Sequence, residues 1–179
     1  MKKLTALLLA ALMLLSLGTA LAGENETARA KYVFFFIGDG MGAPQTTATR
    51  YYLGTRDNPD SAYPVPGKLS FDNFEAMGLM TTYDATSFAP DSASTASSMA
   101  SGAKTLSGVI NYDVKKETPF KLVSEYAKEA GMKVGVVSSV SLDHATPAAF
   151  YAKAPSRNQY YDISVQGLTG TILDFLGGG

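Results

Sequence analysis

The hydrophobic positions of the chain follow two alternating patterns. Runs composed mostly of aliphatic, β-branched and aromatic residues occupy positions 31–37, 133–138 and 172–176. Such runs are typical of strands buried on both faces, as in a parallel sheet. Helical spacing or helix-capping residues mark the segments between them, which are 44–53, 70–77, 92–101, 119–130, 144–152 and 162–169. Strands that alternate with helices predict an α/β fold, here a three-layer α/β/α sandwich with a mostly parallel sheet.

The two ends of the chain frame this domain. Lys2 and Lys3, an apolar run at 4–17 and an A-x-A pattern at 20–22 have the layout of a secretory signal peptide. We therefore expect export to the periplasm or the exterior without a stable membrane anchor, a retained anchor being the alternative. Residues 23–30 are polar and are expected to form a flexible lead-in to a domain at 31–179. That domain is expected to be incomplete at its C-terminus, where the last apolar run enters three glycines.

Composition narrows the possible chemistry. The chain has 179 residues, a length that predicts one domain, and a formal net charge of −1 without a basic stripe. These features argue against a specific nucleic-acid partner. It contains no cysteine, which excludes disulfides, zinc-thiolate sites and a cysteine nucleophile. Its single histidine is His144.

A run of small and hydroxylated residues at 92–101 predicts a closely packed helix. Pro90 disfavours helix just before it, Asp91 or Ser92 can cap its start, and Gly102 can end it. Ser92 then lies at a helix N-terminus, where the helix dipole favours negative charge. A hydroxyl there suits attack on a phosphoryl group. The alternative is a packing helix whose serines have no chemical role.

Asp39 lies in a glycine-rich turn directly after the first apolar run. Ligands of open α/β sheets bind at the carboxyl edge of the strands, and a carboxylate there can bind magnesium or zinc. One alternative is an ordinary turn residue. Another is the dinucleotide fingerprint, formally matched by Gly38, Gly40 and Ala43. An acid inside the loop would repel a pyrophosphate, which argues against that match.

His144 and Thr146 follow the second apolar run and are expected at the same sheet edge as Asp39. Both are candidate metal ligands, and the alternative is local capping of the next helix by Asp143 or Thr146. A Ser-His-Asp triad through His144 is a further alternative. Arg157 is either a bidentate clamp on phosphate oxygens or a solvated loop residue.

Three segments together resemble the alkaline phosphatase family. They read Phe-Ile-Gly-Asp-Gly-Met-Gly at 36–42, Asp-Ser-Ala-Ser-Thr-Ala at 91–96, and His-Ala-Thr-Pro-Ala-Ala at 144–149, with Arg157 following. Their order and spacing match the family across essentially the whole chain after the signal peptide. The resemblance implies hydrolysis of small phosphate monoesters, two zinc ions and one magnesium in a complete site, and a homodimer of the complete protein.

The resemblance also implies roles for the nucleophile and the metals. Ser92 would attack phosphorus and form a phosphoserine while it coordinates one zinc, since metal coordination activates a weak hydroxyl nucleophile. Asp39 would bridge that zinc and the neighbouring magnesium.

The remaining roles concern the third metal and the phosphate. Thr146 would be a magnesium ligand. His144 stands where some branches of the family have Asp and others His, which leaves zinc or magnesium open for the third site. Arg157 would hold the phosphoryl oxygens, and Asp91 would orient it.

One departure from the family pattern is large. The family's two-zinc site takes several histidines and further carboxylates, whereas this chain has one histidine. We therefore expect a truncated sequence with negligible phosphatase activity on its own. The alternatives are a non-catalytic exported phosphate- or metal-binding module and a related metal-dependent esterase acting on sulfates or phosphodiesters.

Overall fold

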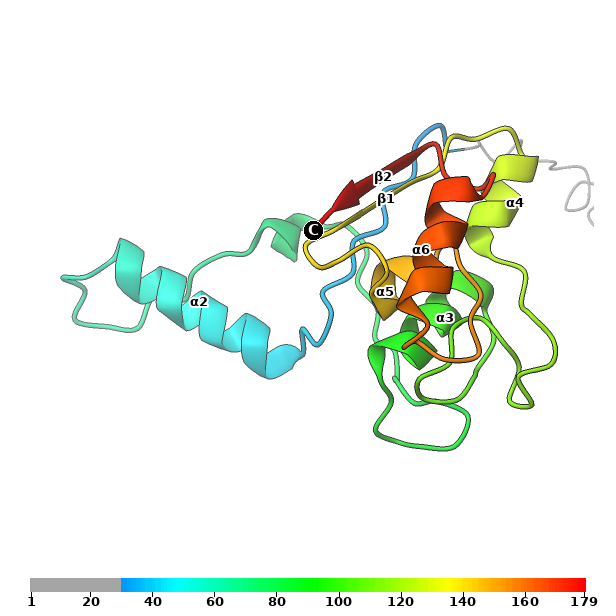
Figure 1. Cartoon of the computed structure of the whole chain (residues 1–179). Coiled ribbons are helices and arrows are strands. Elements are labelled where there is room, and N and C mark those ends of the chain that lie inside the picture. The colour runs from blue at the N-terminus through cyan, green and yellow to red at the C-terminus, as the bar shows by residue number, and fades with distance from the viewer. Residues whose placement is uncertain (1–29) are drawn as a thin grey trace, which may run out of the picture. The chain divides into compact units, whose positions relative to one another are not determined.

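The computed structural model describes residues 30–179, shown in Figure 1. The predicted signal peptide and the lead-in up to residue 29 lie outside them. The elements in chain order are α2 (Ala43–Asp57), the 3-10 helix η1 (Ser70–Asn73), α3 (Ser92–Ser101), α4 (Val123–Glu129), β1 (Gly135–Ser138), α5 (Ala145–Ala148), α6 (Tyr160–Thr169) and β2 (Phe175–Gly178). No helix among these residues is long and apolar enough to span a bilayer.

The described residues belong to two compact units, one ending at Ile37 and the other running from Gly38 to Gly179. In the first unit the predicted strand at 31–37 is wrong. Its residues have no strand conformation, and the side chains from Tyr32 to Phe36 are 62–85% exposed. An apolar run becomes a strand only when a neighbouring strand supplies ladder hydrogen bonds. The sheet of the described residues contains only β1 and β2.

In the second unit, β1 and β2 form a parallel pair, with Gly135 opposite Phe175 and Ser138 opposite Gly178 (Figure 1). The predicted parallel pairing of these two runs is confirmed. The prediction that they are buried on both faces is wrong, because exposure alternates along β1 and Val137 is 74% exposed. One face of the pair is covered, which is the pattern of a half-buried sheet.

Helix α3 forms as its sequence predicts. The Asp91 side chain caps the N-terminus by accepting a hydrogen bond from the Ser94 backbone N–H, and Gly102 ends the helix at a left-handed φ of 75°. Its buried face consists of small residues, which allow neighbouring segments to approach closely: Ala93, Ser94, Ala96, Ser97 and Ala100.

The core gathers around α3. Helix α3 packs against α5 and α4, and α5 also contacts β1. Three larger apolar side chains complete the core, and each is 0% exposed. They are Ile110 in the loop after α3, Leu122 at the start of α4, and Ile163 in α6. The other predicted helices are present with shifted ends: α2 continues to Asp57, α4 begins at Val123, and α5 is a single short turn. The core therefore packs directly against the buried face of α3.

Candidate active site

The glycine-rich turn holds Asp39 in an exposed position beside the start of α3. The turn is closed by backbone hydrogen bonds from Met41 to Gly38 and from Gly42 to Gly40, both 3.0 Å. Gly40 has a φ of 68°, which a residue with a Cβ adopts only at a cost. The Ser92 hydroxyl donates a hydrogen bond of 3.0 Å to Asp39 Oδ1. The predicted nucleophile and the predicted metal ligand are therefore in direct contact.

Thr146 completes this contact from the other side. It is the second residue of α5, and its hydroxyl donates to Asp39 Oδ2 over 2.7 Å. The Asp39 carboxylate thus joins α3 and α5 with one oxygen to each. The suggestion that Asp143 or Thr146 caps α5 is wrong, because the N-cap residue is His144 and no side chain makes a capping hydrogen bond there.

Asp91 and Arg157 form the second part of the site. Arg157 Nη1 donates to Asp91 Oδ2 over 2.9 Å, and the Gly108 backbone N–H donates to the same oxygen over 3.0 Å. Asp91 Oδ1 accepts the Ser94 N–H and hydroxyl at 3.0 and 2.9 Å. Arg157 is half-buried in this pairing, so its interpretation as a solvated loop residue is wrong.

These contacts decide the charge of Asp91. Burial acts to raise the pKa of its carboxyl, but hydrogen bonds from Ser94, Arg157 and Gly108 outweigh that effect and lower the pKa below its ordinary value. Asp91 is therefore ionised at neutral pH and holds the Arg157 guanidinium in a fixed orientation.

The single histidine lies beside the same guanidinium. His144 Nε2 is 3.4 Å from Arg157 Nη2. His144 Nδ1 is buried and has no hydrogen-bond partner among residues 30–179. The histidine therefore belongs to the Arg157 side of the site.

The donor atoms around Asp39 decide which metal the described residues fit. A carboxylate with a hydroxyl on each oxygen is a set of hard oxygen donors, which suits magnesium. Zinc prefers nitrogen and sulfur ligands, and this chain has one histidine and no cysteine. No group of three or more His, Asp or Glu side chains within the described part could hold a metal ion. The residues fit one edge of a magnesium site and do not make a zinc site.

Two contributors to the site were missed by the sequence analysis. The Gly108 N–H and the Ser94 hydroxyl both bind Asp91. Ser94 had a local signal, since an N-cap acid commonly binds the backbone two or three residues later. Gly108 had no local signal other than being a glycine, and its φ here is 77°.

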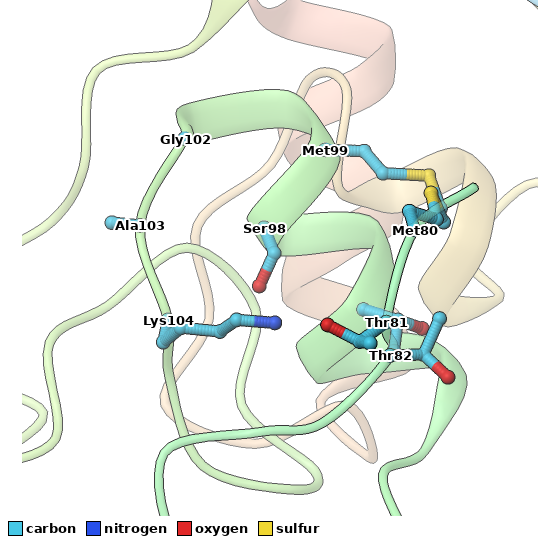
Figure 2. Close-up of a pocket in the computed structure, with 9 residues that line it drawn as sticks. Met80, Thr81, Thr82, Ser98, Met99, Gly102, Ala103 and Lys104 are labelled. Atoms are coloured by element: carbon cyan, nitrogen blue, oxygen red, sulfur yellow. The ribbon is translucent and has the colours of Figure 1, made fainter. Parts of the chain in front are cut away.

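A cavity of about 250 Å³ lies elsewhere on α3 (Figure 2). It is lined by residues 80–82 on one side and, on the other, by Thr95, Ser98 and Met99 of α3 and by residues 102–104. Lys104 Nζ donates to the Tyr83 carbonyl over 2.6 Å. None of the six candidate site residues lines this cavity.

Comparison with known proteins gives a consistent result. The alkaline phosphatase family profile matches residues 30–172. Alkaline phosphatase 4 of Drosophila melanogaster is 36% identical over 148 residues, which are 79% of this chain and 24% of that protein. Alkaline phosphatase 4 of Bacillus subtilis (strain 168) is 34% identical over 169 residues, which are 89% of this chain and 35% of that protein. The chain thus spans about a quarter to a third of the length of these curated relatives.

Comparison with solved structures leads to the same family. Alkaline phosphatase from the Antarctic bacterium TAB5 superposes with a TM-score of 0.68 at 32% identity, covering 78% of this chain and 37% of that one. A variant of the same enzyme, in which a histidine is replaced by aspartate, has Mg bound in its M3 site; it gives a TM-score of 0.55 at 35% identity over 57% of this chain and 29% of that one. This likeness confirms the predicted α/β fold class. Since the family profile covers well over half of the sequence, the chain belongs to the alkaline phosphatase family.

Proposed function

We propose that this chain carries the nucleophile and the phosphate clamp of an enzyme that hydrolyses phosphate monoesters. The observation that supports this most is the pair of contacts on Asp39, which brings Ser92 and Thr146 together from positions 53 and 107 residues away. Arg157, held by Asp91, supplies the positive charge that such a substrate requires.

Ser92 is the proposed nucleophile. Its Oγ attacks phosphorus, the bond between phosphorus and the ester oxygen breaks, and the phosphoryl group remains on Ser92. The hydroxyl proton passes along the existing hydrogen bond to Asp39, and the leaving alcohol takes a proton from solvent. Water then attacks phosphorus and gives its proton to solvent, the bond between phosphorus and Ser92 Oγ breaks, and inorganic phosphate leaves. Asp39 returns its proton to Ser92 Oγ, which restores the hydroxyl. The N-terminus of α3 favours the negative charge of the phosphoryl group throughout.

Arg157 is the proposed phosphate clamp. Its guanidinium can bind two phosphoryl oxygens at once, which fixes the substrate and offsets charge on the equatorial oxygens. Asp91 orients the guanidinium through Nη1. Asp91 therefore acts on the substrate through Arg157.

Asp39 and Thr146 are the proposed protein ligands of a magnesium ion, with His144 as a further candidate. A bound divalent cation would lower the pKa of a nearby hydroxyl and offset phosphate charge. The two zinc ions expected in a complete site need ligands beyond the one histidine of this sequence. Export, and a homodimer of the complete protein, remain part of the proposal.

A chimera tests the proposal. Residues 30–172 would replace the matching part of TAB5 alkaline phosphatase, and hydrolysis of p-nitrophenyl phosphate would be measured. We expect turnover in the chimera and a loss of about 1,000-fold or more in its Ser92→Ala variant. The matched control is Ser101→Ala at the far end of α3, which should keep its activity. Equal activity of the two variants would refute the role of Ser92.

The second candidate function is a non-catalytic phosphate- or metal-binding module, favoured by the single histidine. We expect the 179-residue chain alone to turn over p-nitrophenyl phosphate no faster than its Ser92→Ala variant. Turnover by the chain well above that variant would contradict this expectation. Inorganic phosphate binding by the chain, together with an inactive chimera, would favour the binding module.

A further inference from the structure

A short segment after α3 contacts Asp91, the segment that carries Arg157, helix α3 and the turn after α5, and we call residues 108–111 the strap. Its first residue, Gly108, donates its N–H to Asp91 Oδ2 over 3.0 Å and accepts the Arg157 N–H at 2.7 Å. Ile110 and Ala154 form an antiparallel bridge with two hydrogen bonds of 2.9 Å. The strap therefore fixes the segment that carries Arg157 against α3.

Asn111 ends the strap and is fully buried, with 0% exposure. Its backbone N–H donates to the Ser97 hydroxyl on α3 over 2.9 Å. Its side-chain Nδ2 donates to two carbonyl oxygens, those of Ala149 and Ala152, at 2.7 Å each. Both amide protons are used on the turn that immediately follows α5, and one residue links that turn to α3.

We propose that Asn111 is a positioning residue that holds α5, and with it Thr146, in register with Asp39 and Ser92. Its consequence for catalysis rests on the function proposed above. The structural part, that the Asn111 amide sets where Thr146 lies, stands without it.

The shortness of α5 is the reason that it needs such a support. Its four residues form a single turn, and a helix of that length is not stable by itself. Thr146 lies three residues before Ala149, whose carbonyl Asn111 binds. A shift of that turn would be transmitted directly to the Thr146 hydroxyl, which lies 2.7 Å from Asp39 Oδ2.

Position 111 requires a left-handed backbone and a side chain with two hydrogen-bond donors, and asparagine provides both. Asn111 has a φ of 56°, a left-handed conformation that asparagine tolerates better than most residues. Its amide also offers two donors on one nitrogen. Glycine would tolerate the backbone but has no donor, and aspartate has a similar shape but would present a carboxylate to two carbonyl oxygens.

The test uses the full 179-residue chain with Asn111→Asp and Asn111→Gly. NMR would follow the Thr146 methyl signal and the hydrogen-exchange protection of the Ala148, Ala149 and Ala152 amides, with Ile163 of α6 as the reference amide. The control is Leu122→Ala, which weakens the core without removing the Asn111 amide. None of these readouts depends on turnover, so an inactive chimera would leave this test intact.

In both Asn111 variants we expect the Thr146 methyl signal to shift. We also expect protection of the three amides to fall about tenfold or more relative to Ile163, since two buried hydrogen bonds are lost. Leu122→Ala should lower protection at all four amides alike. An unmoved Thr146 signal, a uniform loss of protection in the Asn111 variants, or failure of both to fold would overturn the proposal, because Asn111 would then serve stability alone.

Discussion

Helices α2 and α3 were both predicted from the sequence, yet they have opposite surroundings. Helix α3 buries five of its ten residues against α4, α5 and the strap, whereas Gly54 is the buried residue of the fifteen-residue α2. Tyr51 and Tyr52 of α2 are 63% and 65% exposed. The site residues on and around α3 are therefore fixed by packing, while Asp39, in the exposed turn before α2, is fixed by its contacts with Ser92 and Thr146.

The charged pairs of the two regions differ in their further contacts. The Asp91–Arg157 pair is half-buried, and Asp91 accepts three further hydrogen bonds. The Arg50–Asp72 pair joins α2 to η1 and is about as accessible, but Asp72 accepts only one further hydrogen bond among the described residues, from the Leu69 backbone N–H. The first pair organises a site, and the second ties two exposed elements together.

The largest effect on stability should come from the core beneath α3. Leu122 is 0% exposed, and Leu122→Ala should lower the free energy of unfolding by about 2–5 kcal/mol, through lost burial and the cavity left behind. Tyr52→Ala on α2 should change it by about 0.5 kcal/mol or less. Urea unfolding of both variants measures the difference, and similar losses would remove the contrast between the two regions.

Asp91→Asn should have the next largest effect. It should lower the free energy of unfolding by about 1–3 kcal/mol at pH 7, because charge-assisted hydrogen bonds are lost. The lowered pKa of Asp91 means that its contribution is complete above the unfolded pKa of about 4 and is lost as pH falls through the folded pKa. The difference in free energy of unfolding between the wild type and Asp91→Asn should therefore shrink as the pH is lowered from about 4.

A series of urea unfolding curves from pH 7 to pH 2 checks this prediction. Asp39→Asn is the matched control, since that carboxylate is exposed, and the amide oxygen can accept from one of the two hydroxyls while the amide nitrogen donates to the other. A wild-type advantage over Asp91→Asn that stays constant across the series would contradict the assigned role of the Asp91 charge.

The smallest loss of stability should come from the Arg50–Asp72 pair, which joins two elements with few buried residues. Asp72→Asn should leave the urea midpoint within experimental error at physiological salt, because an ion pair in contact with water and salt contributes little to stability. A loss comparable to that of Asp91→Asn would mean that the exposed region is held as firmly as the site.

Local signals explain which features the sequence could predict. Helix α3 was predicted with its caps because Asp91 and Gly102 act on the residues next to them. The grouping of Asp39, Ser92 and Thr146 followed from family motifs in the right order. The roles themselves stay proposals, because contact between side chains does not establish chemistry.

Features that depend on distant segments could not be predicted in the same way. The run at 31–37 has strong β propensity, but a strand also needs a partner that no local pattern supplies. Asn111 carries no motif, and its importance comes from carbonyls 38 and 41 residues further along the chain. The contact of His144 with Arg157 likewise depends on how α5 packs.

The proposed function depends most on Ser92 as the residue to which the phosphoryl group is transferred. Mass spectrometry of the chimera, quenched with acid during hydrolysis of p-nitrophenyl phosphate, tests it directly. We expect a phosphoryl group on the peptide that contains Ser92, located on that serine and absent from the Ser92→Ala variant. Continued ester hydrolysis with no phosphoryl group on Ser92, or with the group on Ser94, would contradict it.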